Sequence, residues 1–428
     1  MKLKLNKRGL LPSLVAVFRV DAGPGIGMGH FMRCRTIALE MIKRGWFVYF
    51  VGWGLPEELM SYSSVNSPIS WIEFKPSHET NEDMKRFLEI LRTRFSFNVN
   101  FVIFDSYRFK RDDYAFLQLF GQRIPVAIID DMAQQDTPAQ VVINPNPLFS
   151  PEPYQRQKIP RILCGEQYTL IRPEVVALRD RAYDSAGPVL ITLGGGDVVE
   201  PLMKVLDAMP EHLGRKIVVS VSQNCPMNEI QNWISNDPEN RYVNTDSEKF
   251  PELLASASVA ITGGGGTLWE VYCLGIPGLS IVWVDNQKHT STIIKDQATS
   301  FLVDLISHIN IEMQSEMLET GLQKIVETLG PPGSTRIVHE KGFRTSDVIS
   351  REKTSLVVDN VEAIDKKFIR KAISRLTSDF GFPQGMMRKQ RQLIDGMGAQ
   401  RVVTALEEQK WEQVPLFGAD YRRNYEDW

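Results

Sequence analysis

Cysteine is scarce in this chain of 428 residues, which has four in total. They lie far apart and form no CxxC pair, so neither a disulfide framework nor a structural zinc site is expected. The sequence also lacks any apolar run near the roughly 20 residues that a membrane span needs. Its formal net charge of −3 argues against a general nucleic-acid binder, because phosphate binding draws on a cationic excess.

The N-terminus is basic and then apolar, as in a signal peptide. Pro12 and Ser13 interrupt the apolar stretch, and no small-residue cleavage site follows it. Residues 14–20 are therefore predicted to form a buried first strand, and the expected location of the protein is the cytoplasm. With 43% hydrophobic and 24% charged residues, the composition is typical of an ordinary folded protein.

Apolar runs of strand length alternate with helical patterns along most of the chain. Strands are predicted over residues 14–20, 46–53, 99–105, 126–130, 216–222 and 278–285, and a helix over residues 30–44. Residues 189–197 are predicted to form a strand and a glycine loop, and residues 259–275 a strand, a glycine loop and a helix. Continuous apolar strands separated by helices indicate parallel sheets covered on both faces. The fold class is therefore α/β, with two Rossmann-like domains facing a cleft and ligands bound at the carboxyl ends of the strands.

Proline marks the expected boundaries. Residues 145–163 contain five prolines and little periodicity, as in an inter-domain linker. We assign residues 1–150 to a first Rossmann-like domain and residues 151–330 to a second. Residues 331–428 are predicted to form a mainly helical extension. Its basic stretch at 366–375 forms either a solvated helix face or a contact with an anionic lipid or a partner.

The glycine loop after the first strand leads into a helix that begins near His30. Gly27 and Gly29 leave backbone N–H groups free to meet an anion at the helix N-terminus. His30 either activates water or a hydroxyl near neutral pH, or merely caps the helix or packs against it. Arg33 lies one turn further along the same face and pairs either with a phosphate or with Asp21.

Two glycine loops in the second half predict a nucleotide site, with tight turns as the alternative. Side-chain-free positions let the backbone approach a diphosphate closely. Glu270, expected in the first turn of a helix, either accepts hydrogen bonds from ribose hydroxyls or compensates the helix dipole. Polar residues that end the next strand either face the same crevice or cap a loop. The candidates in this half are Gly194, Gly195, Gly265, Gly266, Thr267, Glu270, Asn286 and Gln287.

Acidic residues follow two further strands of the first half. Asp105 and Tyr107 follow one of them, and Asp130 and Asp131 follow the other. Such acids either act in acid–base chemistry or metal binding, or cap helices and fix loops, and the second role is the commoner one. Neither a metal site nor a cofactor is predicted.

These motifs, taken in order, resemble the UDP-sugar hydrolases of the pseudaminic acid pathway (UDP-2,4-diacetamido-2,4,6-trideoxy-β-L-altropyranose hydrolases). FRVDAGPGIGMGHFMRC (18–34) is similar to their opening motif R-x-D-x-x-x-x-I-G-x-G-H-x-x-R. The resemblance continues through FDSY (104–107), IDD (129–131), CGEQYTLIRPE (164–174), ITLGGGD (191–197), GGGGTLWE (263–270) and DNQ (285–287). Wider relatives are the glycosyltransferase-like proteins of spore coat polysaccharide synthesis and the MurG-type GT-B glycosyltransferases.

The resemblance implies a GT-B architecture and a metal-independent hydrolase of nonulosonic (pseudaminic) acid biosynthesis. Such an enzyme releases a 2,4-diacetamido-2,4,6-trideoxyhexose from UDP with inversion. The resemblance implies that the catalytic residues are His30, as the general base, together with Asp21 and Arg33 of the same motif. It further implies substrate contacts from the opening loop and Tyr107, a ribose contact from Glu270, and a donor site at Asn286 and Gln287.

Two alternatives to the hydrolase remain open. The first is an inverting glycosyltransferase in which His30 deprotonates an acceptor hydroxyl, because the extension beyond residue 331 offers room for an acceptor or a protein partner. The second is a non-catalytic nucleotide-sugar-binding module. His30 beside an intact glycine loop argues against this second alternative, since a pure binder needs no base there.

Overall fold

The computed structural model describes residues 14–23, 26–54, 69–95, 99–110, 113–114, 125–133, 139–147, 149–194, 198–211, 213–281, 347–349, 356–358, 366–378 and 381–408. The chain divides into two compact units. Unit 1 comprises Met1–Pro145, Ser150–Leu170 and Gly398–Trp428, and unit 2 comprises Asn146–Phe149 and Ile171–Met397. The last described helix therefore belongs to the same unit as the first strand.

The core of unit 1 is a parallel sheet. Among the described residues it has seven strands: β1 (Val15–Val20), β2 (Phe47–Gly52), β3 (Ser70–Glu73), β4 (Phe101–Asp105), β5 (Val126–Ile129), β6 (Val141–Asn144) and β7 (Arg161–Cys164). Their order in the sheet is β3-β2-β1-β4-β5-β6-β7, and every pair is parallel. The four strands predicted for this half and its parallel sheet are confirmed.

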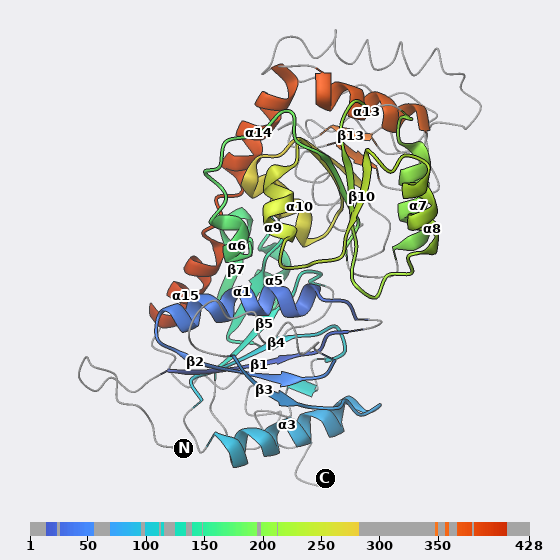
Figure 1. Ribbon diagram of the computed structural model, residues 1–428. Helices are drawn as coiled ribbons and strands as arrows, with labels where there is room; N and C mark the ends of the chain where they lie inside the picture. Colours follow the sequence, from blue (N-terminus) through green and yellow to red (C-terminus); the bar gives the residue numbers. More distant parts are fainter. Residues whose placement is uncertain are drawn as a thin grey trace. The chain divides into compact units, whose positions relative to one another are not determined.

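Helices cover both faces of this sheet (Figure 1). Helix α1 (Gly29–Lys43) buries Phe31, Cys34, Ala38 and Met41 against β1, at the three- and four-residue spacing of one helix face. On the opposite face, α3 (Thr80–Arg94) packs Phe87 edge-on against a ring of β4, with 5.5 Å between the ring centroids. Both faces are apolar, which explains the near-continuous hydrophobic runs of the strands.

The segment 145–163, expected to be a linker, differs in the structure. It contains α5 (Glu152–Arg156) and the start of β7, which pairs in parallel with β6 and completes the sheet of unit 1. Tyr154 of α5 is fully buried. Pro153 lies in the first turn of α5, where the missing N–H costs no helical hydrogen bond, and the other prolines lie outside these short elements. Proline content alone therefore did not distinguish short elements from a linker.

The core of unit 2 is a second, mostly parallel sheet. Its seven described strands are β8 (Val189–Thr192), β9 (Ile217–Ser220), β10 (Arg241–Asn244), β11 (Val259–Gly263), β12 (Gly278–Ile281), β13 (Asp347–Ile349) and β14 (Leu356–Val358). The order is β10-β9-β8-β11-β12-β14-β13, and only the β13–β14 pair is antiparallel among these strands. The predicted strands β8, β9, β11 and β12 are confirmed.

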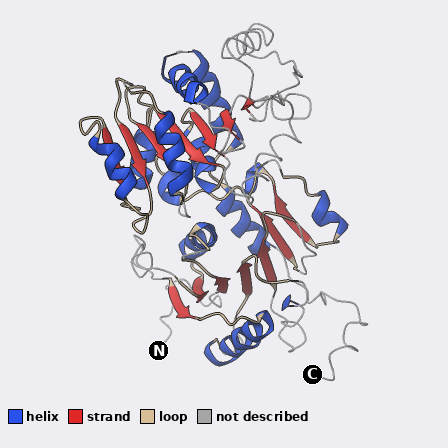
Figure 2. Ribbon diagram, turned by 90° about the vertical axis from the view of Figure 1, so that its right-hand side faces the viewer, coloured by secondary structure: helices blue, strands red, loops and turns tan. Residues whose placement is uncertain are grey.

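Helices also flank both faces of this sheet (Figure 2). One face carries α7 (Val199–Ala208), α8 (Asn228–Ser235) and α13 (Lys366–Ser378), whose apolar residues share a core cluster with alternate residues of the strands. The other face carries α9 (Phe250–Ser256) and α10 (Gly266–Leu274), with the short α6 (Pro173–Val176) beside them. Helix α14 (Gly381–Leu393) packs against α10.

The described helices of the expected C-terminal extension belong to the two units. Ile369, Ala372, Ile373 and Leu376 of α13 are buried in the core of unit 2, at helical spacing, while Arg370 is exposed. Helix α15 (Gly398–Glu408) packs against α1 in unit 1. The stretch 366–375 thus lies on a helix whose apolar side completes the core of unit 2.

Close packing at the start of α15 leads to a stability prediction. A Cβ on Gly398 would lie 2.1 Å from the carbonyl oxygen of Thr169, a backbone atom that cannot rotate away. We expect Gly398→Ala to lower the free energy of unfolding by about 2 kcal/mol, the usual range for overpacking. Thermal and urea unfolding would measure this loss, with Gln400→Ala on the same helix as the control. Equal stability of the two variants would contradict the prediction.

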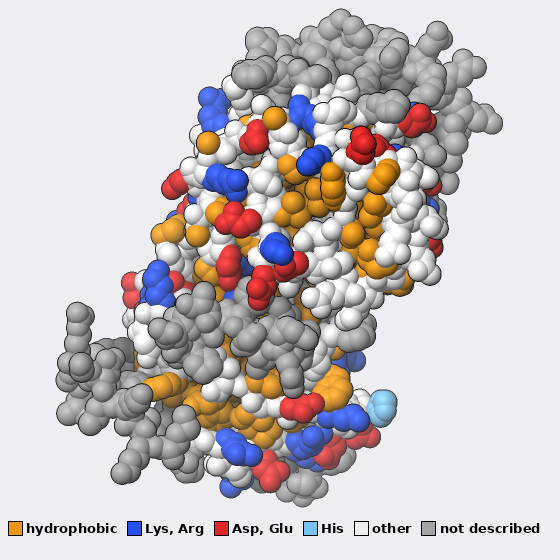
Figure 3. Space-filling model, in the orientation of Figure 1, with side chains coloured by type: hydrophobic (Ala, Val, Ile, Leu, Met, Phe, Trp, Pro, Cys, Tyr) orange, Lys and Arg blue, Asp and Glu red, His pale blue; other side chains and the backbone are white. Residues whose placement is uncertain are grey.

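The described surface carries charges of both signs. Lysine and arginine side chains lie among aspartate and glutamate side chains on the face shown in Figure 3, in keeping with the small net charge. Within the described ranges, no helix combines the length and the apolar character needed to cross a membrane.

Candidate active site

The strand order of each sheet reverses at one place, and the candidate residues gather there. In unit 1 the reversal lies between β1 and β4, and in unit 2 between β8 and β11. In sheets of this kind, ligands bind beyond the carboxyl ends of the strands at such a reversal. In unit 1, α1 follows β1 and Asp105 ends β4, which places His30 and Asp105 on either side of the reversal.

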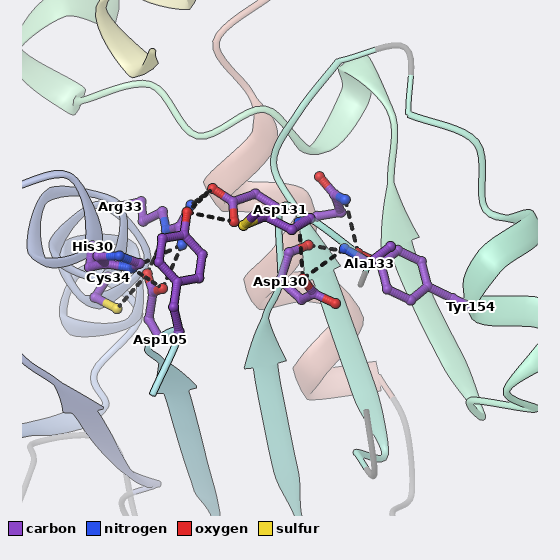
Figure 4. A network of polar contacts seen from close by, with 11 residues as sticks. His30, Arg33, Cys34, Asp105, Asp130, Asp131, Ala133 and Tyr154 are labelled. Carbon is purple, nitrogen blue, oxygen red and sulfur yellow. Dashed lines mark hydrogen bonds and ion pairs between the residues drawn. The ribbon is translucent and has the colours of Figure 1, made fainter. Parts of the chain in front are cut away.

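His30 and Asp105 form a buried pair at this point (Figure 4). The imidazole Nδ1 lies 2.5 Å from Oδ1 of Asp105, and the two residues are 8% and 1% exposed. His30 is the second residue of α1, which has no side-chain cap at its N-terminus. Its ring therefore reaches across to β4, and the alternative that it caps its own helix is not what the structure shows.

Arg33 holds the carboxylate of this pair in place. Its Nε donates to Oδ2 of Asp105 at 2.5 Å and its Nη2 to Oδ1 at 2.6 Å, a two-pronged contact. Its Nη1 donates to Oδ2 of Asp131 at 2.6 Å. Arg33 thus pairs with Asp105 and Asp131 and not with Asp21, one of the two partners considered from the sequence. It lies on the same helix face as His30, as predicted, with Nη2 3.0 Å from Nδ1.

The charges around Asp105 decide which nitrogen of His30 carries a proton. Burial by itself would raise the pKa of Asp105, but the charges and hydrogen bonds of Arg33 and His30 outweigh it, and the pKa is lowered. An ionised carboxylate only accepts hydrogen bonds, so we assign the proton of His30 to Nδ1. In the neutral ring with that tautomer, the lone pair is on Nε2, which has no hydrogen-bond partner among the described residues. This is the arrangement that a general base requires.

Tyr107 flanks the imidazole. Its ring lies edge-on to that of His30, with centroids 4.6 Å apart, and its hydroxyl donates to Asp131, whose two oxygens are each 2.9 Å away. Burial and the negative charge of Asp131 raise the pKa of Tyr107, so the hydroxyl stays protonated. Tyr107 is nonetheless 47% exposed, which leaves one side of the ring open to solvent beside His30.

The hydroxyl of Tyr107 provides a modest prediction. Tyr107→Phe keeps the ring against His30 and removes only the donor to Asp131. We expect a loss of about 0.5–1.5 kcal/mol in the free energy of unfolding, the usual contribution of one hydrogen bond. Urea unfolding would measure it, and a variant as stable as the wild type would show that solvent replaces this hydrogen bond fully.

A second group of contacts holds the turn that presents Asp131 (Figure 4). The carboxylate of Asp130 accepts hydrogen bonds from the backbone N–H groups of Met132 and Ala133, both at 3.0 Å. The hydroxyl of Tyr154 donates to the Asp130 carbonyl oxygen at 2.7 Å, and Asn144 donates to that hydroxyl at 2.9 Å. Asp130 therefore fixes a loop, the commoner of the two roles considered for these acids.

Asp21 belongs to the same opening motif as His30 and Arg33, but its hydrogen bonds are with other residues. Its carboxylate accepts hydrogen bonds from Arg19 at 2.6 Å and from the backbone N–H of Trp53 at 3.0 Å. These contacts join the end of β1 to the loop after β2. Gly27 adopts a φ of +81°, which favours glycine, whereas a Cβ on Gly29 would meet no atom within 4 Å.

In unit 2, the loop after β11 leads through Gly265 into α10. Gly265 is the N-cap residue of α10, Gly266 and Thr267 are its first two residues, and Glu270 is the fifth. Glu270 therefore lies beyond the first turn, which corrects the placement expected from the sequence and removes the basis for dipole compensation. Gly194, after β8, has a φ of +112°. Gly195, Asn286 and Gln287 lie outside the described residues.

Two residues that are central to this geometry could not be recognised as site residues from the sequence alone. Asp105 and Asp131 follow strands, as many loop-fixing acids do, and only the sheet order shows that Asp105 faces His30. Among the described residues, no group of three or more His, Cys, Asp or Glu side chains is arranged to hold a metal ion.

Comparisons with known proteins agree with the fold. No family model matches the chain. A stretch of 146 residues is 26% identical to the spore coat polysaccharide biosynthesis protein SpsG of Bacillus subtilis. The match covers 33% of this chain and 43% of SpsG, so less than half of that relative is represented.

Solved structures resemble the chain over nearly its whole length. MurG of Acinetobacter baumannii is 14% identical with a TM-score of 0.52, covering 93% of this chain and 100% of that one. UDP-GlcNAc 2-epimerase of Neisseria meningitidis, solved with UDP-GlcNAc, is 12% identical with a TM-score of 0.53, covering 93% and 100%. The chain has the two Rossmann-like domains of the GT-B fold, as predicted.

Proposed function

We propose that the chain is an inverting enzyme that transfers a sugar from a nucleoside diphosphate to an acceptor hydroxyl, with His30 as general base. The observation that carries this proposal is the buried His30–Asp105 pair at the strand reversal of unit 1, in which Nδ1 of His30 contacts Asp105 and Nε2 has no hydrogen-bond partner among the described residues. The likeness to SpsG and to GT-B glycosyltransferases supports it and favours transfer over the hydrolysis that the opening motif suggested.

The proposed reaction assigns one role to each part of the pair. Nε2 of His30 takes the proton of the acceptor hydroxyl as its oxygen bonds to the anomeric carbon. The bond from that carbon to the diphosphate oxygen breaks, and its electron pair leaves with the diphosphate. Asp105 stabilises the imidazolium that forms, and Arg33 keeps Asp105 ionised and aligned.

Unit 2 would bind the nucleotide. The N-terminus of α10, with Gly265, Gly266 and Thr267, offers backbone N–H groups to a diphosphate. A Cβ on Gly266 would meet no described atom within 4 Å, so packing within the protein does not require glycine there. A ligand that approaches the backbone closely would require it. Glu270 would accept hydrogen bonds from ribose hydroxyls.

Hydrolysis remains the second candidate, because water can take the place of the acceptor hydroxyl beside Nε2. The opening motif around His30 and Arg33 favours it. The sugar would then be a 2,4-diacetamido-2,4,6-trideoxyhexose, as the resemblance implies, and the reaction would belong to nonulosonic acid biosynthesis.

Time-resolved NMR with UDP-sugars tests these candidates. The donors are UDP-GlcNAc and UDP-2,4-diacetamido-2,4,6-trideoxy-β-L-altropyranose, each with and without a panel of sugar acceptors. Consumption of the donor only when an acceptor is present, with a new inverted glycosidic linkage, is the expected result. Free sugar and UDP without an acceptor would indicate the hydrolase, and an epimerised nucleotide sugar would overturn both. Binding of UDP without any turnover would favour a non-catalytic binder.

A further inference from the structure

Arg33 lies between two carboxylates (Figure 4). It donates from Nε and Nη2 to Asp105, and from Nη1 to Oδ2 of Asp131 at 2.6 Å. The side chain of Asp105 is fully buried, and those of Arg33 and Asp131 are 15% and 18% exposed. One guanidinium therefore pairs with two carboxylates in a largely buried cluster, and the imidazole of His30 lies against one side of it.

Two further titratable groups near His30 are neutral. The hydroxyl of Tyr107 stays protonated, because burial and the charge of Asp131 raise its pKa. Burial also raises the pKa of the Cys34 thiol, whose Sγ lies 3.6 Å from Oδ2 of Asp105. Within the described part of the chain, the charged groups of this contact network are therefore one guanidinium and two carboxylates.

The turn after β5 holds Asp131 in its place beside the guanidinium. The carboxylate of Asp130 accepts hydrogen bonds from the backbone of Met132 and Ala133, so it is turned to its own loop. Ala133 has a φ of +50°, a conformation that a residue other than glycine adopts only where surrounding contacts impose it. The fully buried Tyr154 donates from its hydroxyl to the carbonyl oxygen of Asp130 at 2.7 Å. The turn is thus constrained by contacts from inside and outside the loop.

We propose that Asp131 is a positioning residue for His30: it offsets the charge of Arg33 and so favours the imidazolium that forms when the base takes a proton. This inference rests on the proposed function, in which His30 is the general base. A cation beside an imidazole disfavours its protonation, and Nη2 of Arg33 lies 3.0 Å from Nδ1. A second carboxylate on the same guanidinium reduces this repulsion, and the imidazole becomes a stronger base.

NMR of the ligand-free protein labelled with nitrogen-15 histidine tests this role without any substrate. The ring nitrogens change their chemical shifts when an imidazole takes up a proton, and the His30 signal is identified by its loss in His30→Asn. Asp131→Asn keeps the shape of the side chain and removes its charge, so the pH midpoint of this signal should move down by about one unit. Asp131→Glu keeps the charge and should leave the midpoint within about 0.2 unit of the wild type.

Tyr154→Phe tests whether the turn transmits this effect. The variant keeps the ring and removes the donor to Asp130, so the midpoint should move in the same direction by a smaller amount, about half a unit. Tyr183→Phe is the matched control, because the Tyr183 hydroxyl also donates to a backbone carbonyl oxygen, that of Ser258 at 2.8 Å in unit 2. Both variants should lower the melting temperature, and only Tyr154→Phe should move the midpoint.

Turnover should show the same effect in kcat and spare the KM. On the plateau of the pH profile, kcat of Asp131→Asn should fall by about tenfold, because a weaker base takes the acceptor proton less readily. The acid side of the profile should move down together with the NMR midpoint. The KM for the donor should stay within about twofold of the wild type, because the nucleotide would be held in unit 2.

The outcomes separate the two proposals. An Asp131→Asn variant with the midpoint of the wild type would overturn the role of Asp131 and leave the proposed function standing. A wild type that turns over no nucleotide sugar would overturn the proposed function, and the NMR midpoints would still decide whether Asp131 acts on His30. If Asp131→Asn does not fold, Tyr154→Phe decides: a wild-type midpoint rejects the inference.

Discussion

Replacing His30 with asparagine should lower kcat for sugar transfer by about 10²–10⁴-fold, the usual contribution of a general base. Asparagine places an amide N–H near the position of Nδ1, so the hydrogen bond to Asp105 and the local fold should persist. The lone pair of Nε2 disappears, and the acceptor hydroxyl keeps its proton as the new bond forms. The KM for the donor should change little, because the nucleotide would be held in unit 2. Release of nucleoside diphosphate under saturating donor and acceptor measures the effect.

His78→Asn is the control for this experiment. His78 is exposed, so its replacement should leave kcat and the melting temperature unchanged. An unchanged kcat in His30→Asn, with a folded protein, would remove the general-base assignment and favour a reaction that proceeds without it.

Asp105→Asn should produce the second large effect, on both catalysis and stability. A neutral amide accepts the hydrogen bond from Nδ1 of His30 more weakly than a carboxylate does. Its N–H₂ group would also face the N–H donors of Arg33, with which it cannot form a hydrogen bond. We expect kcat to fall by about 10²–10⁴-fold, as when the carboxylate behind a catalytic histidine is neutralised. Breaking a buried ion pair on one side costs about 3–5 kcal/mol, because the remaining charge stays buried. Because Arg33 also pairs with Asp131, its charge keeps one partner, and the loss in unfolding free energy should lie near the lower end of that range.

The stability effect should depend on pH with a defined sign. The pKa of Asp105 is lower in the folded protein than its ordinary value, so the carboxylate contributes stability above about pH 4. That contribution is lost as the pH falls through the folded-state pKa. The difference in unfolding free energy between the wild type and Asp105→Asn should therefore be largest at neutral pH and shrink below about pH 4.

Asp113→Asn provides the matched control for Asp105→Asn. Asp113 is also a buried carboxylate, and it accepts hydrogen bonds from Thr80 and from the backbone of Lys110. Its replacement should destabilise unit 1 while kcat stays within a few fold of the wild type. An equal fall in kcat for the two variants would mean that lost stability, and not the position of His30, explains the effect of Asp105→Asn.

The strands with long apolar runs could be predicted from the sequence because a continuous apolar run of strand length is visible in the sequence itself. β1 (Val15–Val20) and β4 (Phe101–Asp105) are buried on both faces, and continuous β-branched and aromatic runs between helices leave little choice but a parallel sheet. β7 (Arg161–Cys164) was missed because four residues between Pro160 and Gly165 are too few to show a periodicity. Its place depends on pairing with β6, which is a tertiary contact.

The sequence by itself determined the α/β class, the doubling of the strand–loop–helix pattern and the position of His30 at the start of a helix. These features follow from local periodicity and from the conformational freedom of glycine, which are properties of neighbouring residues. Only the tertiary structure decided the partners of the charged groups. Asp105 lies 75 residues from His30, and Arg172 lies 98 residues from Glu270. The order of the strands brings such residues within hydrogen-bonding distance, and no spacing along the chain encodes that order.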